Sequence, residues 1–144
     1  MKVLLQRVTQ ATVDVAGERV AEIGPGLLAL VGVAPEDGDE QIRWLADKTL
    51  GLRIFPDADK PMNRSVVDVG GELLVVSQFT LTADTSKGKR PGFSTAAPPD
   101  VAEQIYLRFV AELEKSMPVQ TGRFGADMQV SLINDGPVTF MLEK

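Results

Sequence analysis

The stretch KVLLQRVTQATVDVAGERVAEIGPGLLALVGVA, residues 2–34, decides the fold because its pattern is typical of three successive β-strands. Apolar and polar residues alternate over Lys2–Ile23, and many of them are β-branched, as strands prefer. The pair Ala16-Gly17 interrupts this alternation and predicts the turn of a β-hairpin. The run Gly26–Ala34 is continuously apolar, short and bounded by glycine, which indicates a buried strand. This part of the chain is therefore expected to form a hairpin followed by a buried strand.

After this stretch the spacing of apolar residues changes and predicts a helix within PEDGDEQIRWLADKTLG, residues 35–51. Asp37 or Asp39 is expected to cap its start, and Gly51 is expected to end it. Four residues recur on one stripe of this helix and should face the core: Ile42, Leu45, Ala46 and Thr49.

A second helix is predicted within DVAEQIYLRFVAELEKS, residues 100–116. Asp100 is expected to be its N-cap, Glu103 stands at the spacing of a capping box, and Pro118 should stop the helix. Its apolar stripe is formed by Ala102, Ile105, Phe109 and Leu113.

The remaining segments add further strands and one long loop. The strongest strand prediction is GELLVVSQFTL, residues 71–81, which follows Gly70. A polar loop over residues 82–99 comes next, and loops of that length in compact domains are commonly functional. Shorter strands are predicted for GLRIF (51–55), near Val66, for MQVSLIND (128–135) and for VTFMLEK (138–144).

Many strands and two helices predict an α+β fold in one domain spanning residues 1–144. The sheet is expected to be mainly antiparallel and to curl into a barrel-like form, with both helices packed on it. Hydrophobic residues make up 44% of the chain and charged residues 24%, which fits a globular protein with an ordinary core.

Composition also narrows the chemistry, since the chain has no cysteine and no histidine. This removes thiol nucleophiles, the Ser-His-Asp triad and zinc sites built on Cys or His. The acidic pairs lie scattered on predicted loops, so no metal site and no cofactor are expected. An enzyme with this composition would work with hydroxyls, carboxylates, lysine, arginine or the backbone itself.

The sequence also bears on location and partners. No apolar run reaches the roughly 18 residues of a membrane span. The first residues lack the long apolar stretch and cleavage site of a secretory signal, which predicts a cytoplasmic protein. The net charge of −5 argues against broad nonspecific binding of nucleic acid, and no DNA partner is expected.

One candidate site lies in SQFTL, residues 77–81, where the strongest predicted strand meets the long loop. Strand periodicity would place Ser77 and Phe79 on one face, and Gln78 and Thr80 on the other. These polar groups could serve a site, or they could satisfy backbone groups where the strand ends, and the second reading is favoured by the segment alone. A hydroxyl nucleophile here would need a base, and Lys87 is a conceivable but unsupported one.

A second candidate is the basic loop SKGKRPGF, which carries Lys87, Lys89 and Arg90, with Phe93 close behind. Lysine and arginine neutralise phosphates, and an aromatic ring can stack on a base. A solvated charged loop is the simpler interpretation.

The third candidate is NDGPVT, residues 134–139, whose residue types are common in turns. A hairpin turn is the favoured local interpretation, because only about 5–6% of X-Pro bonds in folded proteins are cis. A cis Gly136-Pro137 bond is the alternative.

Taken together, VVSQFTL and TGRFGADMQVSLINDGPVTF resemble the D-aminoacyl-tRNA deacylases. The resemblance extends over essentially the whole chain and includes QRVTQATV, GPGLLALVGV, MNRSV and KGKRPGF. It implies a homodimeric hydrolase, with active sites at the subunit interface, that cleaves the ester between a D-amino acid and the terminal adenosine of tRNA. Glycine mischarged on tRNA is an implied second substrate.

The resemblance also implies roles for individual residues. Ser77, Gln78, Phe79 and Thr80 would hold the adenosine and the ester carbonyl, and Lys87, Lys89 and Arg90 would bind tRNA. A cis Gly136-Pro137 would direct its carbonyls into the partner subunit's pocket, accept the substrate's α-ammonium group and collide with an L side chain. Arg7 would pin this segment, and the substrate-binding group extends to Asn134, Val138 and Thr139.

Two mechanisms and two other functions stay open at this point. Backbone donors and the substrate's own 2′-hydroxyl are preferred over Thr80 as a nucleophile, because nothing in the sequence activates that hydroxyl. A catalytically silent RNA-end binder and an oligomeric scaffold are the other functions.

Overall fold

The computed structural model of the chain describes residues 1–144 and contains six strands, two α-helices and one 3₁₀ helix. None of its helices has the length and apolar character that crossing a bilayer requires. In chain order the elements are β1 (Lys2–Val15), β2 (Glu18–Ile23), β3 (Gly26–Gly32), α1 (Asp39–Gly51), β4 (Glu72–Ser77), the 3₁₀ helix η1 (Phe79–Thr82), α2 (Pro99–Glu114), β5 (Val119–Thr121) and β6 (Gln129–Glu143).

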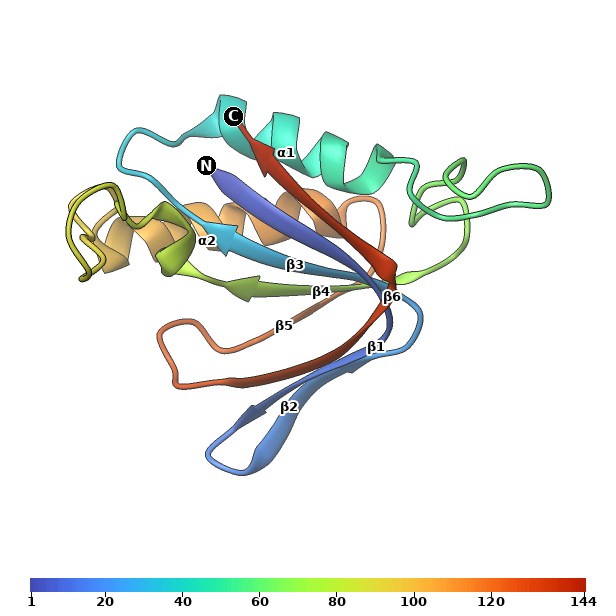
Figure 1. The fold of residues 1–144 in the computed structure, drawn as a ribbon, viewed down its shortest axis with the longest axis horizontal. Coiled ribbons are helices and arrows are strands. Elements are labelled where there is room, and N and C mark those ends of the chain that lie inside the picture. The colour runs from blue at the N-terminus through green and yellow to red at the C-terminus, as the bar shows by residue number, and fades with distance from the viewer.

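All six strands belong to one sheet with the order β2-β1-β3-β4-β5, and β6 pairs with β1 (Figure 1). The pairs β1–β2, β1–β3 and β1–β6 are antiparallel, whereas β3–β4 and β4–β5 are parallel. The expected α+β class and barrel-like sheet are confirmed. The sheet is mixed rather than overwhelmingly antiparallel, because α1 and α2 each lie in a connection between two parallel strands.

The curl of the sheet comes from β1, which pairs with different partners along its length. Residues Lys2–Val8 pair with β3, whereas residues Ala11–Val15 pair with β2. β6 follows β1 along nearly its whole length, with register shifts on either side of Val8. The first half of β1 therefore belongs to the wall under the helices, and the second half bends away with β2.

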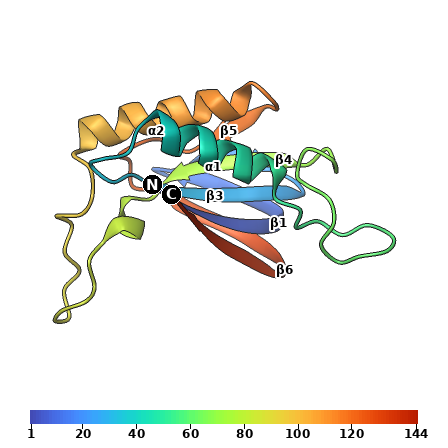
Figure 2. The same cartoon turned by 90° about the horizontal axis from the view of Figure 1, so that it is seen from above.

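Both helices cover the same face of the sheet and lie beside each other (Figure 2). Between helices and sheet lies the larger hydrophobic cluster, and a smaller one fills the inside of the curled half. Every residue of the two expected apolar stripes is buried, which confirms both helix predictions: Ile42, Leu45, Ala46 and Thr49 in α1, and Ala102, Ile105, Phe109 and Leu113 in α2.

The expected N-caps of both helices are wrong, whereas α1 ends at Gly51 as expected. Gly38 is the N-cap of α1, and its N–H donates to the Gln41 side chain at 3.0 Å. The Asp37 carboxylate accepts instead from the Ala34 N–H at 2.6 Å, closing a turn before the helix. Pro98 is the N-cap of α2, so Asp100 lies within the first turn, where a carboxylate favours the helix dipole without capping.

Four expectations about strands also need correction. GLRIF forms only a single bridge, Phe55 with Arg64, and Val66 lies in a turn. The short strand β5 was not expected, because three residues carry too little periodicity to show. The two strands predicted after residue 128 are one continuous strand, β6, because both halves pair with β1 across the Gly136-Pro137 segment.

Candidate functional site

The first part of the site forms where β4 ends. Ser77 is the last residue of β4, the Gln78 N–H donates to the Val31 carbonyl at 2.7 Å, and the chain then turns into η1. The expectation of strand-like alternation over Ser77–Thr80 is therefore wrong after Ser77, because a 3₁₀ turn rotates successive side chains by about 120°.

Close packing of η1 against the end of β3 depends on Gly32. A Cβ added at Gly32 would lie 3.0 Å from the Leu81 Cβ and 3.1 Å from the Gln78 carbonyl oxygen. Glycine therefore allows a closer approach between the two elements than a larger residue would.

Two backbone donors at the start of η1 have no hydrogen-bond partner in the chain. As at the start of any helix, the N–H groups of Phe79 and Thr80 have no partner within η1, and neither donates to a side chain. The later groups are used, since Leu81 N–H donates to the Gln78 carbonyl and Ala83 N–H donates to the Thr80 carbonyl, each at 3.2 Å. Two adjacent free donors are suited to binding the oxygen of a carbonyl group.

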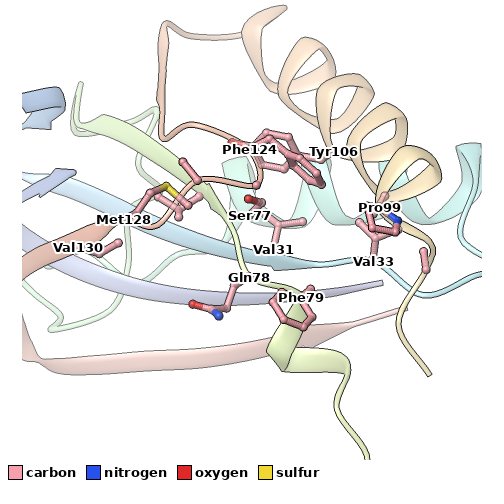
Figure 3. Close-up of a pocket in the computed structure, with 15 residues that line it drawn as sticks. Val31, Val33, Ser77, Gln78, Phe79, Pro99, Tyr106, Phe124, Met128 and Val130 are labelled. Atoms are coloured by element: carbon pink, nitrogen blue, oxygen red, sulfur yellow. The ribbon is translucent and has the colours of Figure 1, made fainter. Parts of the chain in front are cut away.

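Beside these donors lies a cavity of about 420 Å³ with mostly apolar walls (Figure 3). Ser77 points toward the rings of Phe124 and Tyr106, while the Gln78 side chain points to the opposite side. Met128 and Val130 close one wall, and α2 contributes the opposite one. A pocket of this size and character fits a planar aromatic group such as a nucleobase.

Of the residues that line this cavity, the sequence predicted only Ser77, Gln78 and Phe79 as site residues, and the larger side chains that it missed include Tyr106, Phe124 and Met128. Phe124 and Met128 belong to TGRFGADM, whose residues show no local pattern typical of a site. Its position between β5 and β6 was hidden because β5 was not expected.

Tyr106 has a structural part in the cavity wall. Its hydroxyl donates to the Val75 carbonyl at 2.9 Å, and its ring centroid lies 5.7 Å from that of Phe124. Burial raises the pKa of the Tyr106 phenol, so the group stays neutral and is a poor proton acceptor.

The Thr80 hydroxyl has no base beside it. It accepts a hydrogen bond from the Gln78 side-chain amide at 2.5 Å, and an amide N–H cannot remove its proton. Lys87 makes no hydrogen bond with Ser77 or Thr80. No group of three or more acidic side chains is placed to hold a metal ion.

The basic residues Lys87, Lys89 and Arg90 lie at the exposed tip of the loop between η1 and α2. This loop projects from the body of the protein (Figure 2). None of the three cations forms a salt bridge within the chain, so their charges are available to a partner.

The second part of the site is the Gly136-Pro137 segment in the middle of β6. Its peptide bond is cis, and both residues are exposed. The hairpin-turn interpretation is wrong, because β6 continues to pair with β1 on both sides. Gly136 has a φ of 144°, and a Cβ there would lie 2.5 Å from the Val138 Cγ2, so the position requires glycine.

Hydrogen bonds made by the side chains of Arg7 and Asn134 hold this segment in place. The buried Arg7 guanidinium donates to the Ile54 carbonyl at 2.6 Å and to the Asp135 carbonyl at 3.0 Å. The Asn134 side chain accepts from the Val138 N–H at 2.7 Å and donates to the Thr139 hydroxyl at 2.8 Å. The structure thus brings together all six residues expected around this segment: Arg7, Asn134, Gly136, Pro137, Val138 and Thr139.

Within one chain the two parts of the site lie far apart. Ser77 pairs with Val31 of β3, whereas Arg7 pairs with Leu27, four residues earlier on the same strand. At about 3.3 Å per residue, this separates the two positions by about 13 Å along the sheet. The Gly136-Pro137 segment, which Arg7 holds, therefore lies at a different level of the sheet from Ser77 in the cavity of its own chain.

Comparison with known proteins agrees with this architecture. The family model described as D-Tyr-tRNA(Tyr) deacylase matches residues 4–143. A D-aminoacyl-tRNA deacylase of Teredinibacter turnerae is 60% identical over 99% of both chains. One of Chlorobaculum parvum is 56% identical, over 99% of this chain and 97% of the relative.

Solved structures have the same fold. One, titled c-Myc DNA Unwinding Element Binding Protein, is 42% identical with a TM-score of 0.95, covering 100% of this chain and 99% of that one. Another, titled as a probable eukaryotic D-amino acid tRNA deacylase, has a TM-score of 0.81 at 21% identity, covering 98% and 97%. With a full-length family match and relatives of more than half identity, the chain belongs to the D-Tyr-tRNA(Tyr) deacylase family.

Proposed function

We propose that the protein hydrolyses the ester bond of D-aminoacyl-tRNA and releases the free D-amino acid and tRNA. Family membership supports the reaction, and one structural observation carries it: the adjacent N–H groups of Phe79 and Thr80 are unpaired, and Phe79 lines an apolar cavity. The cavity would hold the terminal adenine, and the N–H groups would hold the ester carbonyl. The cytoplasm is the compartment proposed for this reaction.

Positioning and oxyanion stabilisation account for the chemistry. Water attacks the ester carbonyl carbon, and the N–H groups of Phe79 and Thr80 stabilise the negative oxygen that develops. The carbon–oxygen bond to the ribose then breaks, and the ribose oxygen takes up a proton as it leaves. The neighbouring 2′-hydroxyl of the substrate is suited to assist these proton transfers. Removing a single oxyanion donor typically costs about 10²–10³ in rate.

The site is completed by a second copy of the chain. Arg7, which holds the Gly136-Pro137 segment, and Ser77, which lines the cavity, stand about 13 Å apart along one sheet, so each cavity would receive the segment of a partner subunit. β6 supports such an interface, because it pairs only with β1 and leaves its other edge open. Its exposed apolar side chains would be covered on dimerisation: Ile133, Phe140 and Met141.

The partner's Gly136-Pro137 segment would act as a steric gate for chirality. Its backbone carbonyls would accept the α-ammonium group of the substrate, and an L side chain would then collide with them. A D side chain would point away, and glycine has no side chain to collide, so glycyl-tRNA would enter too. Arg7 and Asn134 give the segment the rigidity that such a gate needs.

The experiment is incubation of D-Tyr-tRNA and L-Tyr-tRNA with the protein in the presence of a chelator. Release of tyrosine from the D substrate alone supports the proposal. Tight tRNA binding without release from either substrate would favour a silent RNA-end binder, and an absence of both would favour an oligomeric scaffold.

A further inference from the structure

Two phenylalanines form an exposed aromatic pair at the mouth of the cavity. The ring centroids of Phe79 and Phe93 lie 5.0 Å apart with an interplanar angle of 53°. Phe79 is 56% exposed and Phe93 42% exposed, although these are large apolar rings. Such a pair offers a free aromatic face and is not explained by packing in the core.

Phe93 is held in place by the backbone on both sides. Just before it, Asp84 and Gly92 exchange two backbone hydrogen bonds of 2.8 Å. After it, the Thr95 hydroxyl donates to the Thr82 carbonyl, and the Ala97 N–H donates to the Val33 carbonyl at 3.0 Å. The ring is therefore presented by a structured part of the loop, whereas Lys87, Lys89 and Arg90 lie beyond the bridge at its tip.

Phe79 connects the pair to the cavity, and Phe93 belongs to the loop that carries the basic residues. Phe79 lines the cavity and also supplies one of the two free N–H groups (Figure 3). Phe93 lies three residues from Arg90 in the same loop. A chain of nucleotides leaving the cavity over Phe79 would therefore meet an aromatic face and then a cluster of cations, as in binding sites for single-stranded nucleic acid.

We infer that Phe93, packed on Phe79, stacks on the base of the nucleotide that precedes the terminal adenosine of the substrate. This inference rests on the proposed function, because the cavity must hold the terminal adenosine. Phe93 would be a positioning residue: it touches neither the ester nor the reacting water, and it fixes the direction in which the RNA strand leaves. The residues Lys87, Lys89 and Arg90 would meet the phosphates further along.

The test is a pair of short D-aminoacylated RNAs that differ only in the base of the penultimate nucleotide, which is present in one and abasic in the other. Base–aromatic stacking predicts that wild-type protein hydrolyses the intact RNA about tenfold more efficiently, measured as kcat/KM. In Phe93→Ala this difference should shrink to less than about twofold. Phe93→Trp should restore it, whereas Phe93→Leu, which keeps apolar area without an aromatic face, should not.

Leu107→Ala is the control, since Leu107 is 55% exposed on α2, outside the cavity and the loop. It should keep the tenfold preference of the wild-type protein. A preference for the base that persists in both Phe93→Ala and Phe93→Leu would overturn the inference, as would a wild-type protein indifferent to the base. Failure of the proposed function looks different, because wild-type protein would then hydrolyse neither RNA.

Discussion

The Arg7 guanidinium donates a 3.0 Å hydrogen bond to the carbonyl oxygen of Asp135 and lies 3.3 Å from the carboxylate of the same residue. Asp135 directly precedes Gly136, so the buried arginine fixes the chain where the proposed gate begins. A second bond, to the Ile54 carbonyl, ties the gate to the segment after α1. A side chain from the first strand of the sheet thus helps, together with Asn134, to fix the orientation of the proposed gate.

Replacing Arg7 by lysine should weaken the discrimination between D and L substrates. An ammonium group cannot reproduce the planar fork that reaches both carbonyls, so the segment should become more mobile. We expect the ratio of D-Tyr-tRNA to L-Tyr-tRNA hydrolysis to fall about tenfold, with a loss of about 1–3 kcal/mol in the free energy of unfolding.

The matched control for this variant is Arg19→Lys. Arg19 is a half-exposed arginine that pairs with Asp14 and Glu22 on the β1–β2 hairpin. This substitution should change neither the ratio nor the stability by more than about 0.5 kcal/mol. An unchanged D-to-L ratio in Arg7→Lys would show that the arginine does not hold the gate.

At Thr80, the backbone N–H should matter more than the hydroxyl. Thr80→Ala removes the hydroxyl but keeps the N–H, and we expect its rate to stay within about tenfold of the wild-type rate. Replacing Thr80 by its α-hydroxy acid analogue turns the Phe79–Thr80 peptide bond into an ester. This removes the N–H donor and keeps the side-chain hydroxyl. Single-turnover rates should then fall by about 10²–10³. Complete loss of hydrolysis in a folded, tRNA-binding Thr80→Ala would instead identify the hydroxyl as the nucleophile.

The sequence predicted which helix residues are buried, but it did not predict where β4 ends. Ile42 and Phe109 follow helical spacing, so their burial was predictable from local pattern alone. The turn after Ser77 was not, because apolar alternation continues formally through SQFTL while close packing against Gly32 redirects the chain. Burial patterns report which face is covered, and they do not report where a strand stops.

The site itself was predictable only in pieces. Local chemistry at Gly136 and Pro137 favoured a turn, and the family resemblance was needed to expect a cis bond. The cavity wall from Tyr106 and Phe124 was missed, since it forms only when α2 and the segment after β5 meet above Ser77. No local pattern encodes a meeting of residues so distant in sequence.

Neutralising the loop cations should weaken tRNA binding and its dependence on salt. In a triple variant with glutamine at Lys87, Lys89 and Arg90, the slope of log affinity against log salt should shrink by about 0.7–0.9 for each phosphate that the loop no longer neutralises. The comparison is Lys115→Gln, a lysine paired with Glu112 near the end of α2. Equal salt slopes for the triple variant and the wild-type protein would place the tRNA elsewhere.

Mixing two inactive variants should restore activity if each site spans two subunits. Gly136→Ala should disturb the proposed gate, since its Cβ would lie 2.9 Å from the Val138 nitrogen, and Gly32→Ala should disturb η1, which carries the proposed oxyanion donors. After subunit exchange, about half of the dimers contain one copy of each variant, and one of the two sites in each such dimer has both parts intact. About a quarter of all sites are therefore intact. We therefore expect about a quarter of wild-type activity from the mixture and little from either variant alone.

Gly51→Ala serves as the control for these glycine substitutions, because a Cβ at that helix end meets nothing within 4 Å. It should retain full activity alone. A mixture of Gly136→Ala and Gly32→Ala that gains no activity, although subunit exchange is verified, would contradict a site shared between subunits.

In the proposed function this chain removes D-amino acids from tRNA and spares L-amino acids. The most direct measurement is the single-turnover rate of ester hydrolysis for D-Tyr-tRNA and L-Tyr-tRNA, under identical conditions with chelator present. We predict rapid release from the D substrate, with the L substrate decaying no faster than it does without protein. Equal acceleration of both substrates, or of neither, would contradict the account.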